Sequence, residues 1–303
     1  MLPQMTSLTS MCRHCAKHRS LMVAPVKRTA STHFGYQTVD EDQKKEKGQL
    51  GQVFESVAEK YDLMNDLMSG GTHRLWKDHF VKTMVQEAGW GPTHLLDVAG
   101  GTGDIAFRFL DRSKVTDLQH PLTRLCATLT PSGPPTAPST AVTVCDLNAS
   151  MLRVGQRRAS QLGLTSDRLH WIKGDAEQLP FPAHSFEAYS IAFGIRNCTH
   201  LKKVLEEAFR VLKAGGRFYC LEFSRVQNSL LSSLYDLYSF QLIPVMGQLV
   251  ANDWKSYQYL VESIRKFPHQ EEFADLIESV GFRNVGYENQ TNGIVAVHFG
   301  TKP

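Results

Sequence analysis

The sequence has no hydrophobic run long enough to cross a membrane as a helix. Such a helix needs ~20 consecutive apolar residues. The longest apolar patch, residues 242–251, is interrupted by Pro244, Gly247 and Gln248. The sequence therefore predicts a protein that does not span a bilayer.

Acidic residues are absent from the first 39 positions, whereas five basic residues lie there. A basic leader rich in Ser and Thr, without acids and without a continuous apolar core, is typical of a mitochondrial transit peptide and not of a secretory signal. We therefore expect residues 1–39 to be a transit peptide; a disordered basic tail is the alternative. Subtracting those five from the 33 Lys and Arg of the chain leaves 28, against 30 Asp and Glu. This balance excludes the basic surface of a nucleic-acid-binding protein.

Cysteine is scarce, with six residues scattered along the chain. Cys12 and Cys15 form a CxxC pair, but no second pair of ligands follows at the spacing that a zinc site needs. We expect no metal site. The remaining cysteines in apolar contexts are expected to be reduced core thiols: Cys145, Cys198 and Cys220.

Strand-like and helix-like patterns alternate along most of the chain, which predicts a parallel sheet with helices on both faces. The expected helices are 53–68, 76–88, one beginning at 105, 150–162, 201–212 and 270–280, and the expected strands are 95–98, 141–145, 169–173, 186–192, 217–223, 285–289 and 294–299. The last two strands are joined by a short turn and predict an antiparallel hairpin. A mostly parallel, Rossmann-like α/β sheet of seven strands that ends in such a hairpin is typical of a class I methyltransferase.

One catalytic domain, residues 40–303, is expected to follow the leader. Residues 48–90 would form an N-terminal helical cap. Residues 112–140 are rich in Pro, Ser and Thr, and predict an irregular exposed insertion. Residues 226–267 are rich in aromatic side chains and predict helices that either cover the ligand end of the sheet as a lid or complete the core.

The stretch LLDVAGGTGDIAF, residues 95–107, leads from a strand through a glycine-rich turn into a helix. The G-x-G-x-x-A pattern from Gly101 matches the dinucleotide fingerprint, which is weak alone. Asp97 and Asp104 flank the turn and would repel a pyrophosphate, which favours bare N–H groups and a positive helix end. The same carboxylates would attract the sulfonium and ammonium groups of S-adenosylmethionine. We therefore expect Asp97, Gly101, Thr102 and Gly103 to bind S-adenosylmethionine.

The next two strands end in residues suited to the rest of that cofactor. Asp146 ends one strand and can accept hydrogen bonds from both ribose hydroxyls. Asp175 and Ala176 follow the next strand, where they would border the adenine. Together with the glycine turn, this order favours S-adenosylmethionine over a nicotinamide cofactor.

Four stretches resemble the quinone C-methyltransferases of ubiquinone and menaquinone biosynthesis. They are YDLMNDLMSGGTHRLWKD (61–78), IAFGIRN (191–197), RVLKAGGRFYCLEFS (210–224) and DWKSYQYLVESIRKFP (253–268). The third departs from the family at Ala214, where proline is usual. Similarity covers about residues 48–110 and 141–300, so the leader and the insertion lie outside it.

The resemblance implies C-methylation of a polyprenyl-bearing hydroquinone ring, and the leader favours the mitochondrial, ubiquinone-forming members. It also implies association with other ubiquinone-synthesis proteins in a multi-subunit complex on the matrix face of the inner membrane. The protein would then lie at the membrane surface without spanning it. A homodimer is left open.

Methylation of a ring carbon needs a group that takes the proton of a ring hydroxyl and stabilises the oxyanion. Arg196 follows the fourth predicted strand at the ligand edge, and its guanidinium is the candidate catalytic group. The alternative is a structural arginine paired with Asp or Glu. Asn197 is expected to hydrogen-bond a ring oxygen or the cofactor.

Four residues before the sheet are expected to line the substrate pocket: Tyr61, Asp62, Asn65 and His73. His73 is a candidate base because the ordinary histidine pKa lies near neutrality. Tyr61 in the core and Asn65 as a helix-stop residue are the alternatives.

Three other functions remain open from the residues alone: a menaquinone-pathway or other small-molecule methyltransferase, a noncatalytic scaffold of a biosynthetic complex, and, more remotely, a nicotinamide oxidoreductase. The leader argues against the menaquinone pathway, and the 61–76 signature argues against another small-molecule methyltransferase. Against the scaffold stand the intact Asp97, Gly101, Gly103, Asp146 and Arg196, and the acidic turn argues against the oxidoreductase.

Overall fold

The computed structural model describes residues 32–34, 37–39, 65–66, 69–87, 93–119, 140–164, 167–226 and 261–303. Most of the leader, most of the expected helix 53–68, the insertion from 120 to 139 and the aromatic part of the expected lid lie outside these residues. Within the leader, β1 (Thr32–Phe34) and β2 (Gln37–Val39) form a short antiparallel pair. The expectation that residues 1–39 form a transit peptide stays a prediction.

The main sheet has seven strands in the order β5-β4-β3-β6-β7-β9-β8. They are β3 (His94–Val98), β4 (Ala141–Asp146), β5 (Leu169–Lys173), β6 (Phe186–Ala192), β7 (Leu212–Phe223), β8 (Arg283–Gln290) and β9 (Val295–Thr301). Strands β3 to β7 pair in parallel, whereas β9 is antiparallel to both β7 and β8. The predicted C-terminal hairpin is confirmed.

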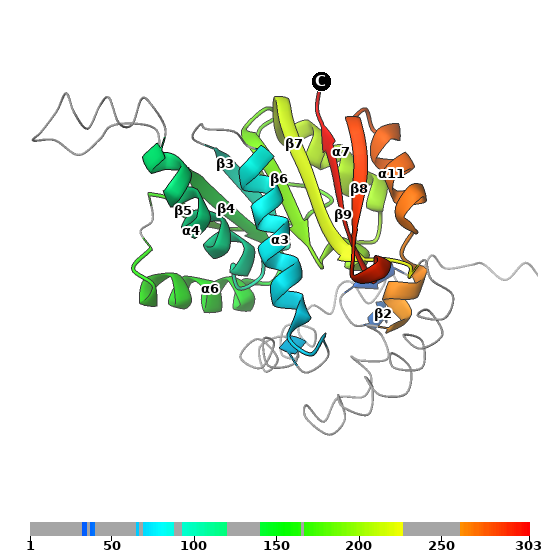
Figure 1. The fold of residues 1–303 in the computed structure, drawn as a ribbon, viewed down its shortest axis with the longest axis horizontal. Coiled ribbons are helices and arrows are strands. Elements are labelled where there is room, and N and C mark those ends of the chain that lie inside the picture. Colours follow the sequence, from blue (N-terminus) through cyan, green and yellow to red (C-terminus); the bar gives the residue numbers. More distant parts are fainter. Residues whose placement is uncertain are drawn as a thin grey trace, which may run out of the picture.

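The chain order reverses between β3 and β6, which is where ligands bind in open α/β sheets, beyond the carboxyl ends of the strands. We call this end of the sheet the carboxyl edge and the opposite end the amino edge. The C-terminus lies at the amino edge, away from the β8–β9 connection (Figure 1).

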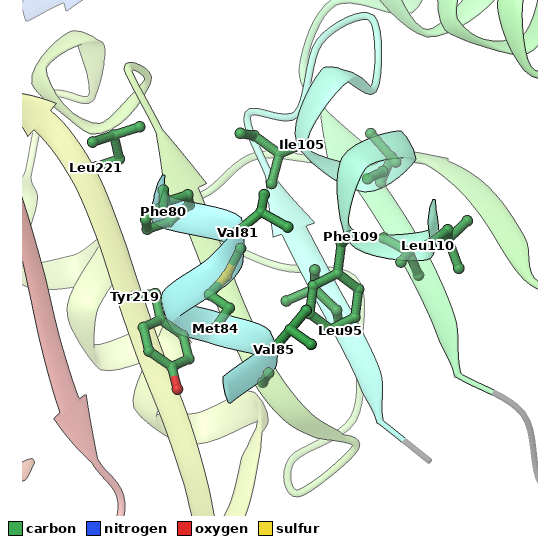
Figure 2. Close-up of a cluster of buried hydrophobic side chains, with 14 of the residues drawn as sticks. Phe80, Val81, Met84, Val85, Leu95, Ile105, Phe109, Leu110, Tyr219 and Leu221 are labelled. Carbon is green, nitrogen blue, oxygen red and sulfur yellow. The ribbon is translucent and has the colours of Figure 1, made fainter. Parts of the chain in front are cut away.

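Helices cover both faces of the sheet (Figure 1). One face carries α3 (Thr72–Glu87), α4 (Asp104–Gln119) and α6 (Ala149–Gln161), and the other carries α7 (Leu201–Val211) and α11 (Gln270–Ser279). Figure 2 shows the first core, where Phe80 and Met84 of α3 meet Tyr219 and Leu221 of β7. The apolar i, i+4 spacing of Phe80 and Met84 explains why this part of the chain is a buried helix.

Helix α3 begins at Thr72, four residues before the predicted start at Trp76. Gly70 and Gly71 precede it with φ of +57° and +80°, conformations that favour glycine. The Ser69 hydroxyl accepts a hydrogen bond from the His73 amide at 3.3 Å and so caps the first turn. Cap chemistry therefore extends the helix beyond its apolar pattern.

Two further boundaries differ from expectation. Helix α4 runs to Gln119, so the first residues of the expected irregular insertion are helical. Strand β7 begins at Leu212, and the predicted turn at Gly215 and Gly216 is a bulge within it. Gly215 adopts φ +77°, and its N–H donates at 2.8 Å to the carbonyl of Lys302, the residue directly after β9, so the bulge stays tied to the end of the neighbouring strand.

Candidate active site

Asp97 is the penultimate residue of β3 and is completely buried. Its Oδ1 accepts a hydrogen bond of 2.8 Å from the hydroxyl of Ser190, its neighbour on β6. Its Oδ2 is also buried and has no hydrogen-bond partner. Burial raises the pKa of Asp97 to about 7. A buried carboxylate oxygen without a partner is costly, so this atom marks a place where a cationic ligand would be stabilised.

The backbone after Asp97 packs closely over that oxygen. A side chain at Gly100 would place its Cβ 2.7 Å from Asp97 Oδ2 and 2.7 Å from a methyl of Val144. Gly100 is therefore required by close packing. The α-ammonium of S-adenosylmethionine has the charge and donors that Asp97 Oδ2 lacks, so the residues present fit this cofactor.

Asp104, at the start of α4, has a different environment from the one expected. Its Oδ2 accepts from Lys77 Nζ at 2.8 Å, and its Oδ1 accepts from Arg108 Nε at 2.8 Å. Burial would raise the pKa of Asp104, but the two cations bring it below its ordinary value. The expectation that two uncompensated carboxylates flank the turn is therefore wrong for Asp104, and Asp97 alone keeps an unpartnered oxygen.

The glycine turn is shaped by two positive-φ glycines with different roles. Gly101 (φ +54°) donates its N–H to Asp146 Oδ2 at 2.9 Å. Gly103 (φ +83°) lies beneath the ring of Trp171, which a Cβ at that position would approach to 2.6 Å. Gly101 thus orients Asp146, the residue expected to bind the ribose, whereas Gly103 is required because the Trp171 ring leaves no room for a side chain. Thr102 is buried, and its hydroxyl accepts from Arg158 Nη1 at 3.2 Å.

The other cofactor candidates lie at the ends of β4 and β5. Asp146 accepts from the N–H of Gly101 and, at 2.7 Å, from that of Asn148, and burial raises its pKa. Asp175 is exposed, and its Oδ1 accepts from the Glu177 N–H at 2.9 Å. Ala176 packs against the core beneath it. The fold therefore brings the seven predicted cofactor residues to the carboxyl edge of three adjacent strands.

Arg196 lies in the 3-10 turn η2 (Ile195–Asn197) that follows β6, and its side chain is only 6% exposed. Its Nη1 donates to Glu222 Oε1 at 2.9 Å and to the Phe193 carbonyl. Its guanidinium carbon lies 5.4 Å from the centre of the Phe223 ring. The ion pair that was the structural alternative is therefore present, and the catalytic role of Arg196 remains a prediction.

Three aromatic rings meet beside Arg196. Trp76 of α3 lies 6.3 Å from Phe193 and 6.2 Å from Phe223, and the latter two are 5.0 Å apart. The Trp76 indole N–H donates to the Thr291 hydroxyl at 2.8 Å, which links α3 to the connection between β8 and β9. We call Trp76, Phe193 and Phe223 the aromatic trio. None of the three was among the site residues expected from the sequence.

The structure describes some of the residues that were expected to line the substrate pocket. His73 is buried at the start of α3; its Nε2 lies 2.8 Å from Asp66 Oδ1, and its buried Nδ1 has no partner. Burial lowers the pKa of His73. Hydrogen bonds, first from Arg74 and then from His73, lower the pKa of Asp66 to about 2. The Asn65 carbonyl accepts from Ser69 at 2.6 Å.

Asn197 ends the η2 turn, and its N–H donates to the Gly194 carbonyl at 3.1 Å. Tyr61 and Asp62 lie outside the described residues. The described part of the chain contains no helix long and apolar enough to cross a membrane.

The sequence reasoning also missed Ser190, Lys77 and Glu222. Ser190 and Glu222 are single polar residues inside apolar strands, in AYSIAF and YCLEFS. A lone polar residue near the end of a buried strand is the signal that could have identified both.

Comparison with known proteins gives a consistent result. Residues 39–302 match the model of the ubiE/COQ5 methyltransferase family. The chain is 56% identical over 283 residues to "2-methoxy-6-polyprenyl-1,4-benzoquinol methylase, mitochondrial" from Danio rerio, covering 90% of this chain and 84% of that protein. The proteins of the same name from Homo sapiens and Drosophila melanogaster are 53% and 54% identical, covering 93% and 90% of this chain and 87% and 85% of theirs.

Solved structures support the fold. A SAM-dependent methyltransferase from Thermotoga maritima, described as a possible histamine N-methyltransferase, superposes with a TM-score of 0.52 at 19% identity, covering 84% of this chain and 100% of that one. A putative S-adenosyl-L-methionine-dependent methyltransferase from Methanococcus maripaludis gives 0.51 at 14% identity, covering 82% and 93%. The predicted class I methyltransferase fold is confirmed.

Proposed function

The chain belongs to the ubiE/COQ5 methyltransferase family, and from this membership we propose that it methylates a ring carbon of 2-methoxy-6-polyprenyl-1,4-benzoquinol in mitochondrial ubiquinone biosynthesis. It is an S-adenosylmethionine-dependent methyltransferase. When bound, S-adenosylmethionine supplies the methyl group as an electrophile. The substrate is proposed from the name shared by relatives that are more than half identical to this chain.

The cofactor assignment depends most on the buried, unpartnered Oδ2 of Asp97. Asp97 would accept from the ammonium group. Asp146, already fixed by two backbone N–H groups, would accept from the ribose hydroxyls. The turn from Gly101 to Gly103 would contact the methionine portion, and Asp175 and Ala176 would border the adenine.

The acceptor ring is proposed to lie on the other side of the strand-order reversal, next to Arg196 and the aromatic trio. The ring carbon becomes nucleophilic when a neighbouring hydroxyl loses its proton. Arg196 would stabilise the resulting phenolate or orient a water that takes the proton, since the guanidinium itself stays charged. Asn197 would hydrogen-bond a ring oxygen. His73 would be neutral at physiological pH because burial lowers its pKa, and so remains the candidate base.

The finer placement in the cell follows from the hydrophobicity of the substrate. A polyprenyl tail partitions into a bilayer, so we expect the protein to work at the matrix surface of the inner membrane without spanning it. Leu242, Ile243, Val245 and Met246, from the expected lid, are candidates to line the tail channel. Association with other ubiquinone-synthesis proteins, and a homodimer, are further expectations. Cleavage on import, between Arg28 and Asp40, would fit the transit-like composition of the leader.

Calorimetric titration with S-adenosylmethionine, with NADH as the control, tests the cofactor. A turnover assay on the benzoquinol, with a demethylmenaquinol as the competing acceptor, tests the substrate. We expect saturable binding of S-adenosylmethionine alone and methylation of the benzoquinol in preference to the menaquinol. Binding without turnover on either acceptor would favour a scaffold, and preference for the menaquinol would overturn the substrate.

Two variants test the cofactor-binding and the catalytic parts of the site separately. Asp146→Ala should weaken S-adenosylmethionine binding by about 10-fold or more, because hydrogen bonds to a charged group contribute about 1.5–3 kcal/mol. Arg196→Ala should lower kcat far more than it lowers cofactor affinity. If Arg196→Ala lowers both equally, the arginine is structural; if Asp146→Ala leaves the affinity unchanged, Asp146 does not hold the ribose.

A further inference from the structure

Glu222 is a fully buried carboxylate whose position repeats that of Asp97. Each is the penultimate residue of its strand at the carboxyl edge, and Glu222 is 1% exposed. Whereas Asp97 keeps an unpartnered oxygen, both oxygens of Glu222 accept hydrogen bonds. Oε1 accepts from Arg196 Nη1 and from the Phe223 N–H, each at 2.9 Å, and Oε2 accepts from the Arg196 N–H at 3.4 Å.

Stability alone gives no strong reason for a charge here. A buried ion pair gains little over apolar residues of the same volume, because two ions must be desolvated. The neighbouring residues Cys220, Leu221 and Phe223 show that this strand end accommodates apolar side chains. The charge of Glu222 therefore calls for a role beyond packing.

The contacts of Glu222 converge on one residue. It accepts from both the side chain and the backbone of Arg196, while the Phe193 carbonyl takes a second bond from the same Nη1. The face of Phe223 lies beneath the guanidinium. A carboxylate, a carbonyl and an aromatic face thus fix the guanidinium in position and in plane.

We propose that Glu222 is a positioning residue for methyl transfer, which holds the Arg196 guanidinium in the orientation that acts on the hydroxyl of the acceptor ring. This inference rests on the proposed function, in which Arg196 stabilises the phenolate. Fixed donors aimed at a developing charge need no reorganisation during the reaction. Glu222 also offsets part of the guanidinium charge and so sets how strongly that charge acidifies the acceptor hydroxyl.

No other charged group in the described residues contacts Glu222. The thiols of Cys198 and Cys220 lie near it, but burial raises their pKa values far above neutrality, so they stay uncharged. Burial raises the pKa of Glu222 itself, although the Arg196 guanidinium opposes this, so a change in pH dependence in a Glu222 variant reports on the Glu222–Arg196 pair and its ligand.

The test compares full-length wild type with Glu222→Gln. The amide keeps the shape and one acceptor oxygen but removes the charge. We expect S-adenosylmethionine affinity and the KM for the benzoquinol to change by less than about 3-fold, while kcat falls by about 100-fold because the guanidinium is misplaced. The acidic limb of the kcat profile should move to lower pH by about one unit, since the guanidinium charge is no longer offset.

Glu222→Asp gives an independent reading if the glutamine variant does not fold. It keeps the charge and shortens the reach, so kcat should fall while the pH profile stays in place. In an Arg196→Lys background, Glu222→Gln should have little further effect on kcat, because its partner is already altered.

Glu187 is the matched control. Like Glu222, it accepts hydrogen bonds from a cation and from a backbone N–H, here those of Lys213 and His94, but it lies at the amino edge. Glu187→Gln should change neither kcat nor its pH profile.

The outcomes separate the two proposals. If wild type does not methylate the benzoquinol, the proposed function fails, and this inference fails with it. If wild type is active and Glu222→Gln keeps its kcat and pH profile, only the inference is overturned. The same holds if the loss persists in full in the Arg196→Lys background, since Glu222 would then not act through Arg196.

Discussion

The amino and carboxyl edges of the sheet treat a buried ionisable side chain in opposite ways. At the amino edge, the buried Lys302 donates from Nζ to the carbonyls of Phe209 at 2.6 Å and Leu212 at 2.7 Å, and lies 3.2 Å from His184 Nδ1. At the carboxyl edge, the buried Asp97 has one partner, and its second oxygen has none.

The same contrast extends to other residues. His73 Nδ1, Ser224 Oγ and Gln290 Nε2 are also buried without partners, and they lie near the carboxyl edge, at the start of α3 and at the ends of β7 and β8. Among the described residues, no buried side-chain atom at the amino edge is unpartnered. Tyr189 Oη and His298 Nδ1, within β6 and β9, are buried without partners as well, so a missing partner indicates a ligand only together with a place at the carboxyl edge.

The largest effect is expected from Asp97→Asn. Losing the carboxylate should weaken S-adenosylmethionine binding by about 100-fold or more, because an ammonium would lose a buried charged partner. The variant should nevertheless be more stable. The pKa of Asp97 is raised from 3.8 to about 7, so the free energy of unfolding falls as pH rises from about 4 to 7. Removing that charge should raise the free energy of unfolding by about 1–3 kcal/mol at pH 8.

Urea unfolding without cofactor at pH 8 and pH 5 checks this. The gain should be present at pH 8 and should shrink at pH 5, where Asp97 is mostly protonated. A variant that is less stable at pH 8 would show that Asp97 serves the framework, and the contrast between the edges would fail.

The second effect is expected from Lys302→Met. The side chain keeps its apolar stem but leaves two carbonyls at the end of α7 without their donor. The loss should be about 2–4 kcal/mol in the free energy of unfolding, from charged hydrogen bonds and unsatisfied buried groups. Cofactor affinity should stay within about 2-fold of wild type, since the variant leaves the carboxyl edge intact. Thermal unfolding and calorimetry measure the two quantities, and a specific loss of affinity would contradict the division between the edges.

The third effect is a pH optimum of cofactor affinity. The binding form needs ionised Asp97, with a pKa of about 7, and a protonated ammonium, whose ordinary pKa is about 7.7–8.0. Affinity should therefore peak between those values and fall by about 10-fold at pH 6. In Asp97→Asn the acidic limb should disappear. Isothermal titration across pH 6 to 9 tests this, and a flat acidic limb in wild type would remove Asp97 from ammonium binding.

The sequence predicts those features that depend on periodicity and strand-end position. The alternating strands, the C-terminal hairpin and the placement of Asp97 and Asp146 at adjacent strand ends were all foreseeable, because parallel strands carry their ligand residues to one edge. The start of α3 could not be predicted, because that helix begins with a serine cap and two glycines of positive φ and not with apolar spacing.

Partnership between residues distant in sequence could not be predicted. Asp104 looked like a second cofactor carboxylate until α3 placed Lys77 against it. Arg196 and Glu222 are 26 residues apart, and only the adjacency of β6 and β7 joins them. Patterns identify which residues reach the edge, whereas three-dimensional pairing decides which of them remain available to a ligand.

The smallest effect is expected from Glu187→Gln at the amino edge. Glu187 pairs with Lys213, but their side chains are 39% and 46% exposed, so solvent screens the pair. Burial opposes ionisation, yet hydrogen bonds from Lys213 and the His94 N–H lower the pKa of Glu187, so its stabilisation is present near neutral pH and is lost as pH falls. The glutamine oxygen can still accept from His94, and the loss should be less than about 0.5 kcal/mol. Urea unfolding at pH 7 and pH 3.5 should show that small difference only at pH 7. A loss above about 1 kcal/mol, or any loss of cofactor affinity, would mean that the amino edge contributes to the site and is not only a framework.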